Sequence, residues 1–286
     1  MTAIRTLMAG AIDYAGLFPP ASLSMADAVR NYARYQSGPD AWALGSFVLP
    51  LERLGEFEAA AAGLGLERRA VLSVILPSAD FERGRIDAGL AFGTVLTAEV
   101  KVKEAAEVDE VVSTIPPGIT NYFEVPVGQN RADLLAAIAE QGERAKLRTG
   151  GVERGSIPSP LDVAAFLIDC ARGKVAFKAT AGLHHAIRGQ HALTYDQDAP
   201  TEWMHGFLNV LMASALVFAG GEREDAVNVL EESSVTAFRI EEDAVTWRGR
   251  SFSADMLQTV REEFAISFGS CSFDEPIGEL RSLGLI

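Results

Sequence analysis

The sequence predicts a single (β/α)8 barrel. Short apolar runs of strand length alternate with amphipathic segments of helical length along the whole chain, and such alternation implies parallel strands. Eight strand–helix units in 286 residues come to about 36 residues each, close to what such barrels use. The doubly wound open sheet also alternates, but its Gly-rich phosphate turns, GxGxxG or GxxxxGK(S/T), do not occur here.

The predicted strands are runs rich in β-branched and other apolar residues, bounded by turn residues. In order, they are Leu7–Asp13, Leu44–Leu49, Ala70–Leu76, Thr97–Lys103, Thr120–Val125, Ala145–Thr149, Val175–Thr180 and Val235–Ile240. A second strand-like piece, Ala244–Arg248, follows the last of these after an acidic turn. A hairpin is therefore the alternative at that end of the chain.

The predicted helices lie between and after the strands, where apolar residues recur at helical spacing. They are Met25–Gln36, Leu51–Ala62, Asp80–Leu90, Ala105–Ile115, Arg131–Gly142, Pro160–Ala171, Trp203–Ala219 and Ser253–Phe264. The most apolar stretch, from Gly206 to Gly220, is shorter than the ~20 residues of a membrane span, so we expect a buried helix.

The chain shows no linker, repeat or low-complexity tract, which predicts one domain over residues 1–286. Residues 265–286 mix small residues, aromatic residues and a thiol, and we expect them to form a C-terminal tail that folds over the barrel mouth.

The composition limits the partners. With 25 Lys and Arg against 39 Asp and Glu, the formal net charge is −14, so we expect no nucleic-acid partner. Because the longest apolar stretch is too short to span a membrane, we also expect no membrane association. Two cysteines, Cys170 and Cys271, make neither a disulfide framework nor a zinc cluster, which predicts a cytoplasmic protein. The apolar content is compatible with a homo-oligomer.

Charged residues alternate with apolar ones on four consecutive predicted strands. Because a barrel strand packs its outer face against helices, where an unpaired charge is costly, we expect these charged faces to point inward. The residues placed there are Glu99 and Lys101, Tyr122 and Glu124, Lys146 and Arg148, and Lys178 and Thr180. A structural ion-pair network is the alternative to an active site.

All four histidines fall between the seventh predicted strand and the apolar helix. His184 and His185 follow Lys178 closely and are candidate general acids or bases, whereas His191 fits a surface position. His205 and Asn209, near the start of the apolar helix, are candidate substrate contacts.

Two further segments are candidate walls of a pocket. The loop from Asp13 and Tyr14 to Ala21 is aromatic and rich in Gly and Pro, which indicates either a rigid pocket wall or an ordinary hydrophobic turn. Cys271 is a candidate nucleophile if a base lies beside it, and a buried thiol otherwise. Cys170 lies on an apolar helical face and is predicted to be in the core.

Residues Phe177-Lys178-Ala179-Thr180-Ala181-Gly182-Leu183 resemble the lysine motif of class I aldolases of the deoxyribose-phosphate aldolase type. In these (β/α)8 enzymes a lysine at a strand end forms a Schiff base with the carbonyl substrate. Lys146, before Thr149-Gly150-Gly151, is similar to the second lysine segment of that family. The resemblance implies lysine chemistry in a barrel and leaves the roles of the two lysines open.

The leading hypothesis is a lyase or isomerase that acts on a small anionic carbonyl compound by Schiff-base chemistry at Lys178, with no cofactor. Only a neutral amine attacks a carbonyl, and Lys146 or Arg148 would lower the pKa of Lys178 as a neighbouring cation. The candidate proton carriers are Glu124, Asp13, His184 and His185. Arg148 would hold a substrate carboxylate or phosphate, with Glu99, Lys101, Tyr14 and Thr180 as further candidate contacts.

Two alternatives stay open. A metal-dependent lyase, isomerase or hydrolase would bind zinc, manganese or iron through His184 or His185 with His205, and with Glu124 or Asp13 as an oxygen ligand. The other alternative is a barrel that binds a small molecule without catalysis, because the fold alone does not specify a reaction.

Overall fold

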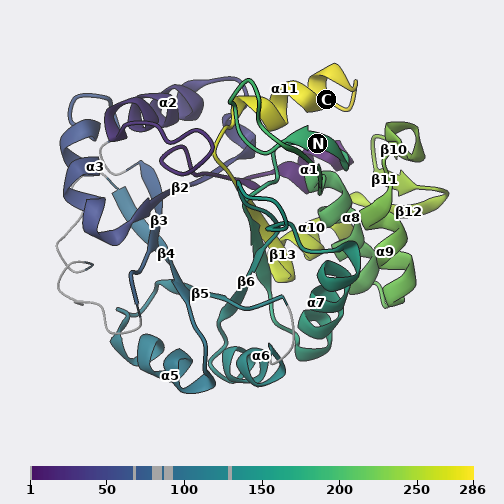
Figure 1. The fold of residues 1–286 in the computed structure, drawn as a ribbon, viewed down its shortest axis with the longest axis horizontal. Coiled ribbons are helices and arrows are strands. Elements are labelled where there is room, and N and C mark those ends of the chain that lie inside the picture. Colours follow the sequence, from purple (N-terminus) through teal and green to yellow (C-terminus); the bar gives the residue numbers. More distant parts are fainter. Residues whose placement is uncertain (1, 67–68, 79–85, 87–92, 128–130) are drawn as a thin grey trace.

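The computed structural model describes residues 2–66, 69–78, 86, 93–127 and 131–286. Eight parallel strands close into a barrel in the order β1-β13-β7-β6-β5-β4-β3-β2 (Figure 1), which confirms the predicted (β/α)8 fold. The barrel strands are β1 (Ile12–Tyr14), β2 (Leu44–Pro50), β3 (Ala70–Ile75), β4 (Gly93–Lys101), β5 (Thr120–Glu124), β6 (Arg144–Arg148), β7 (Phe177–Thr180) and β13 (Ala265–Ser270).

Helices surround the barrel (Figure 1). They are α1 (Ala3–Met8), α2 (Met25–Ser37), α3 (Leu54–Ala61), α5 (Ala105–Thr114), α6 (Arg131–Glu140), α7 (Pro160–Gly173), α8 (Phe207–Phe218), α9 (Arg223–Glu231), α10 (Ala254–Glu263) and α11 (Asp274–Ser282). Serine side chains at Ser24, Ser159 and Ser253 cap the N-termini of α2, α7 and α10 by accepting a backbone N–H. The predicted helix Asp80–Leu90 lies outside the described residues, apart from Ile86. Among the residues that are described, no helix has both the length and the apolar character that crossing a membrane requires.

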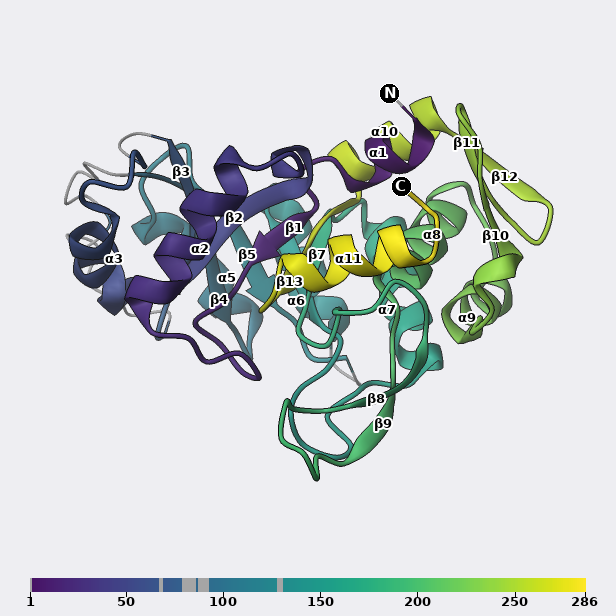
Figure 2. The ribbon, with the colours of Figure 1, turned by 90° about the horizontal axis from the view of Figure 1, so that it is seen from above.

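The last barrel strand differs from the prediction. The first six residues of the segment predicted as a tail, 265–286, form β13, which pairs in parallel with both β1 and β7 and so closes the barrel, and α11 follows it. The predicted strand Val235–Ile240 lies outside the barrel, where β10 (Phe238–Ile240) pairs antiparallel with β11 (Ala244–Trp247), and β12 (Arg250–Ser253) completes a small sheet. Figure 2 shows this sheet at the edge of the molecule. This antiparallel pairing confirms the hairpin alternative. The apolar residues that suggested a barrel strand are buried in the small sheet instead, among them Phe238, Val245 and Trp247.

Two boundaries near the barrel also differ from the prediction. The first two residues of the predicted strand Leu7–Asp13 belong to α1, since Ala3, Ile4, Leu7 and Met8 form one buried helical face, and the strand itself begins at Ile12. The predicted helix Trp203–Ala219 begins at Phe207, and Trp203 lies in β9 (Thr201–Met204), which pairs with β8 (Gly189–Ala192).

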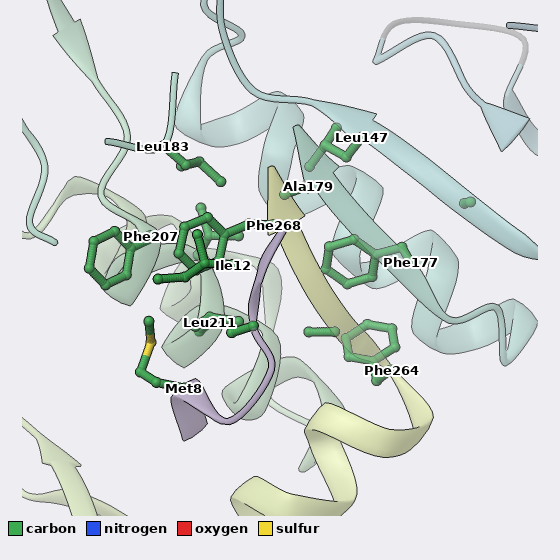
Figure 3. Packing of buried hydrophobic residues seen from close by; sticks show 14 of the residues in the cluster. Met8, Ile12, Leu147, Phe177, Ala179, Leu183, Phe207, Leu211, Phe264 and Phe268 are labelled. Carbon is green, nitrogen blue, oxygen red and sulfur yellow. The ribbon is translucent and has the colours of Figure 1, made fainter. Parts of the chain in front are cut away.

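The apolar core lies between the barrel and its helices. Figure 3 shows one part of it, with Met8, Ile12, Leu147, Phe177, Ala179, Leu183, Phe207, Leu211, Phe264 and Phe268. The rings of Phe207 and Phe268 stack at 5.0 Å, and Cys170 is fully buried in this core, as predicted. Because Phe177 and Ala179 of β7 belong to this outer layer, their strand neighbours Lys178 and Thr180 face the barrel interior.

Candidate active site

Charged side chains from five strands meet inside the barrel. They are Asp13 of β1, Glu99 of β4, Glu124 of β5, Lys146 of β6 and Lys178 of β7. Lys178 is 1% exposed, Glu99 2% and Lys146 6%, so the prediction that these strand faces point inward is confirmed. The ion pairs account for the burial, since a lone charge in this position would be costly.

Lys178 lies between two carboxylates. Its Nζ is 2.6 Å from Oδ2 of Asp13 and 2.6 Å from Oε1 of Glu99. The Tyr122 ring centroid lies 5.2 Å from the same Nζ. Asp13 is fixed in turn by the backbone N–H of Ser46 and the hydroxyl of Ser267, each at 2.8 Å. The ammonium group is therefore held in one place by groups from opposite sides of the barrel.

Glu99 joins the two lysines. Its Oε2 is 3.1 Å from Nζ of Lys146, and Ser73 donates a hydrogen bond of 2.7 Å to its Oε1. Lys146 also contacts Oε2 of Glu124 at 2.9 Å. Lys146 and Lys178 are register partners on the adjacent strands β6 and β7, which is why one carboxylate reaches both.

These contacts overturn the expected electrostatics of Lys178. Burial alone would lower the pKa of Lys178, but Asp13 and Glu99 outweigh burial and raise it above its ordinary value. Burial would raise the pKa of Glu99, but Lys178 and Lys146 lower it to about 2. The expectation that Lys146 or Arg148 would lower the pKa of Lys178 is wrong, because the nearest groups to its Nζ are carboxylates. Lys178 is an ammonium ion at neutral pH.

A cavity of about 190 Å³ opens beside the lysines, and Lys146, Lys178 and Glu99 line it. The loop after β1 forms one wall through Ala15, Phe18, Pro19 and Pro20, so its prediction as a pocket wall is confirmed. Leu193 and Met204, at the ends of the β8–β9 hairpin, line the cavity as well.

Arg148 and Thr180 also line this cavity. Within the part of the chain that the structure describes, Arg148 has no ion-pair partner and is free to bind an anion. Lys101 lies on the same face of β4 as Glu99, but it is exposed at the strand end and does not line the cavity. Glu124 contacts the site through Lys146 and is not among the residues that line the cavity.

Of the four histidines, His184 is the one among the cavity residues. Its Nδ1 is 3.1 Å from Oε2 of Glu275 and 3.3 Å from Oγ of Ser270, and its ring nitrogens lie 3.8 and 3.9 Å from Sγ of Cys271. Burial would lower the pKa of His184, but the contacts with Cys271 and Glu275 raise it to about 9. His184 is thus an imidazolium at neutral pH.

The other histidines lie apart from the cavity. His185 pairs with Glu279 at 3.1 Å and stacks on His191 with ring centroids 3.3 Å apart, while burial lowers the pKa of His191 to about 4. His205 donates from Nε2 to the carbonyl of Pro158 at 2.8 Å. The predicted metal set of His184, His185 and His205 therefore does not converge. Across the described residues, no three His, Cys, Asp or Glu side chains are grouped so that they could hold a metal ion.

Two predicted substrate contacts are structural. The alternation of β1 that turns Asp13 inward turns Tyr14 outward, where its ring packs against Tyr35 at 5.3 Å and Phe47 at 5.9 Å. Asn209 is fully buried in α8, and its amide donates to the carbonyls of Val229 and Glu232. Neither side chain lines the cavity.

Several site residues were not predicted. Ser73 is the one polar residue of the β3 run AVLSVI, a signal that could have placed it against a buried charge. Ser267, Ser270 and Glu275 had no such signal, because their segment does not have the apolar pattern of a barrel strand. Arg144 donates to the Tyr122 hydroxyl at 2.8 Å and so positions the ring beside Lys178.

No protein-family model and no curated protein matches this chain. The similarity of residues 177–183 to the aldolase lysine motif therefore remains a prediction from a short stretch of sequence.

Proposed function

We propose that this protein is an enzyme that acts on a small anionic carbonyl compound, with lyase or isomerase chemistry through a Schiff base at Lys178. The observation that supports this most is the position of Lys178 in the cavity wall, hydrogen-bonded to two carboxylates that can take and return its proton. Barrels of this fold place their active sites at the C-terminal ends of the strands, where this cavity lies.

Because the pKa of Lys178 is raised, the first step of the proposed reaction is the removal of a proton from its ammonium group. Because an ammonium ion is not a nucleophile, one proton passes from Nζ to Asp13 or Glu99 along a hydrogen bond of 2.6 Å. The neutral amine adds to the substrate carbonyl, and the carboxylic acid returns the proton to the former carbonyl oxygen, which becomes the hydroxyl group of a carbinolamine. The same carboxylate then takes a proton from the carbinolamine nitrogen and gives it to this hydroxyl group, so that water leaves and a protonated imine forms. The same carboxylate thus acts first as base and then as acid.

Arg148 and the cavity volume support the proposed substrate class. The guanidinium group of Arg148 binds a carboxylate or phosphate through paired hydrogen bonds, and its charge is not already neutralised by a described carboxylate. A cavity of about 190 Å³ is smaller than the range for drug-sized ligands. We therefore expect a substrate with a few carbon atoms and one anionic group.

The raised pKa of Lys178 favours a second candidate. Asp13 and Glu99 use two of the three N–H donors of the ammonium group, and the third is left for a substrate oxygen. In this candidate Lys178 stays protonated and stabilises an enolate during isomerisation, without a covalent bond to the substrate.

Reductive trapping separates these candidates. The protein is incubated with borohydride and one probe at a time. The probes form two pairs, each with an anionic and a neutral carbonyl compound: glyoxylate and acetaldehyde, and pyruvate and acetone. A Schiff base predicts a mass increase equal to one reduced probe. The fraction of protein that carries this added mass should be larger with the anionic member of each pair. Replacing Arg148 by Met should remove the preference for the anion. Absence of any mass increase would reject the Schiff base and leave the enolate mechanism.

A further inference from the structure

A second group of reactive side chains lies at the cavity, separate from the lysine pair. Cys271 follows directly after β13 and lines the cavity, although it is only 5% exposed. Gly269, two residues earlier and on the same face of the strand, lines the cavity too and has no side chain to fill it. The thiol is therefore next to space that a ligand can occupy.

His184 lies beside this thiol. Its Nδ1 is 3.8 Å and its Nε2 3.9 Å from Sγ of Cys271, so either nitrogen is within reach of the thiol proton. Glu275, in the first turn of α11, contacts Nδ1 of His184 at 3.1 Å. A thiol, an imidazole and a carboxylate that orients the imidazole are the three parts of a cysteine nucleophile site.

Tyr195 completes the cluster. Its hydroxyl donates to Oε1 of Glu275 at 2.8 Å and lies 3.6 Å from Sγ of Cys271. Glu275 is thus fixed from two sides, by Tyr195 and by His184. The contacts with Cys271 and Glu275 raise the pKa of His184 to about 9, so its ring can supply a proton beside the sulfur.

We propose that Cys271 and His184 form a second reactive centre, in which the Cys271 thiolate adds to the carbonyl carbon of a small aldehyde in the cavity. The sulfur electron pair forms the C–S bond, the C=O π pair moves to oxygen, and the imidazolium of His184 supplies the proton that makes a thiohemiacetal. No oxidant or other reactant is needed. This inference goes beyond the Schiff base and does not depend on it.

Cys170 provides an internal control. It is fully buried in the core, burial raises its pKa well above the ordinary value, and it does not line the cavity. Under native conditions we expect iodoacetamide to alkylate Cys271 and leave Cys170 unmodified, as measured by peptide mass spectrometry.

The rate of this alkylation tests the role of His184. Alkylation requires the thiolate, and both ring nitrogens of His184 are within reach of the Cys271 proton. We therefore expect His184→Gln to slow alkylation of Cys271 at pH 6.5 by about tenfold or more. His185→Gln is the matched control, because His185 is adjacent in sequence but does not line the cavity, and it should leave the rate unchanged.

His184→Asn gives a second test should His184→Gln fail to fold, because it too removes both ring nitrogens that lie near Sγ of Cys271. It should slow the alkylation of Cys271 to a similar extent. Equal alkylation rates in His185→Gln and the folded His184 variant would overturn the proposal.

The adduct itself is tested with acetaldehyde labelled with carbon-13 at its carbonyl carbon. We expect a new signal from a tetrahedral carbon in the NMR spectrum of the protein, present in Cys170→Ala and absent in Cys271→Ser. A signal that persists in Cys271→Ser would reject the thiohemiacetal. Reductive trapping should still succeed in Cys271→Ser, so the thiol proposal and the Schiff-base proposal fail independently.

Discussion

Lys178 and Glu99 are the residues on which the interior of this barrel depends. Each is almost completely buried, and each is charged because the other is charged. Removing Lys178 leaves Asp13 without the cation that it pairs with, and removing Glu99 takes from Lys178 one of its two carboxylates. The stability of the fold and the chemistry of the site are therefore linked at single residues.

Replacing Lys178 by Met should destabilise the protein by about 3–5 kcal/mol, the usual cost of leaving a buried ion pair without one partner. Adding Asp13→Asn to this variant removes the carboxylate that has lost its cation, whereas Glu99 still pairs with Lys146, and should restore much of the lost stability. Urea denaturation monitored by circular dichroism measures both differences. If Lys178→Met is as stable as the unmodified protein, the ion pairs do not have the role we assign to them.

The stability that the ionised Glu99 carboxylate contributes should depend on pH. The pKa of Glu99 is about 2 in the folded protein against an ordinary 4.5, so its contribution to stability is complete above pH 4.5 and is lost as the pH falls towards 2. We expect Glu99→Gln to lose less unfolding free energy than the unmodified protein between pH 5 and pH 3. Identical losses in the two proteins would contradict this pKa.

The alternation of charged and apolar residues was sufficient to predict which faces of β4, β6 and β7 point inward. It could not predict that Asp13 and Glu99 reach Lys178 across the barrel, because partners from distant strands depend on strand tilt and stagger. The error about the pKa of Lys178 follows from this. A sequence shows that a lysine is buried, but not which charges surround it.

At the scale of elements, two loops that follow barrel strands approach each other closely. Gly150 follows β6, Gly182 follows β7, and a Cβ atom on Gly182 would lie 3.2 Å from Cα of Gly150. Gly182 also has a φ of +76°, which disfavours other residues. Since Gly182 lines the cavity, this contact shapes the site.

Gly182→Ala should therefore cost more stability than Gly249→Ala. Gly249 has a φ of +85° in the β11–β12 turn, but open space surrounds it, so its substitution costs only the roughly 1–2 kcal/mol of a left-handed alanine. The excess for Gly182 measures the close approach of the two loops. Thermal unfolding of the two variants gives the comparison, and equal losses would show that the loops can separate freely.

The elements themselves were predictable to different degrees. Strands β2 to β7 were found because their apolar runs are long and bounded by turns. β13 was not predicted because Ser267, Gly269 and Ser270 interrupt its apolar pattern. Ser267 contacts Asp13, Gly269 leaves space in the cavity, and Ser270 contacts His184. The residues of β13 that serve the site are therefore the ones that obscure its strand pattern.

For the whole molecule, barrel closure depends on β13. It pairs with β1 on one side and β7 on the other, and without it two strand edges would have no partner. It also places Cys271 and the start of α11 next to His184. The same segment therefore closes the barrel and completes the cavity.

A chain that ends at Phe264 should therefore fail to fold cooperatively. The deletion removes β13 and α11 together, which opens the barrel and removes Ser267 from Asp13. Differential scanning calorimetry should show no cooperative transition for this chain. A sharp transition would mean that residues 265–286 behave as an accessory tail after all.

Peptide mapping of the reduced adduct tests the central claim most directly. After borohydride trapping with glyoxylate, tandem mass spectrometry should locate the added mass on Lys178, and the exposed Lys101 should stay unmodified as a control within the same chain. An adduct on Lys146 instead of Lys178, or one distributed over exposed lysines, would contradict our assignment of the nucleophile.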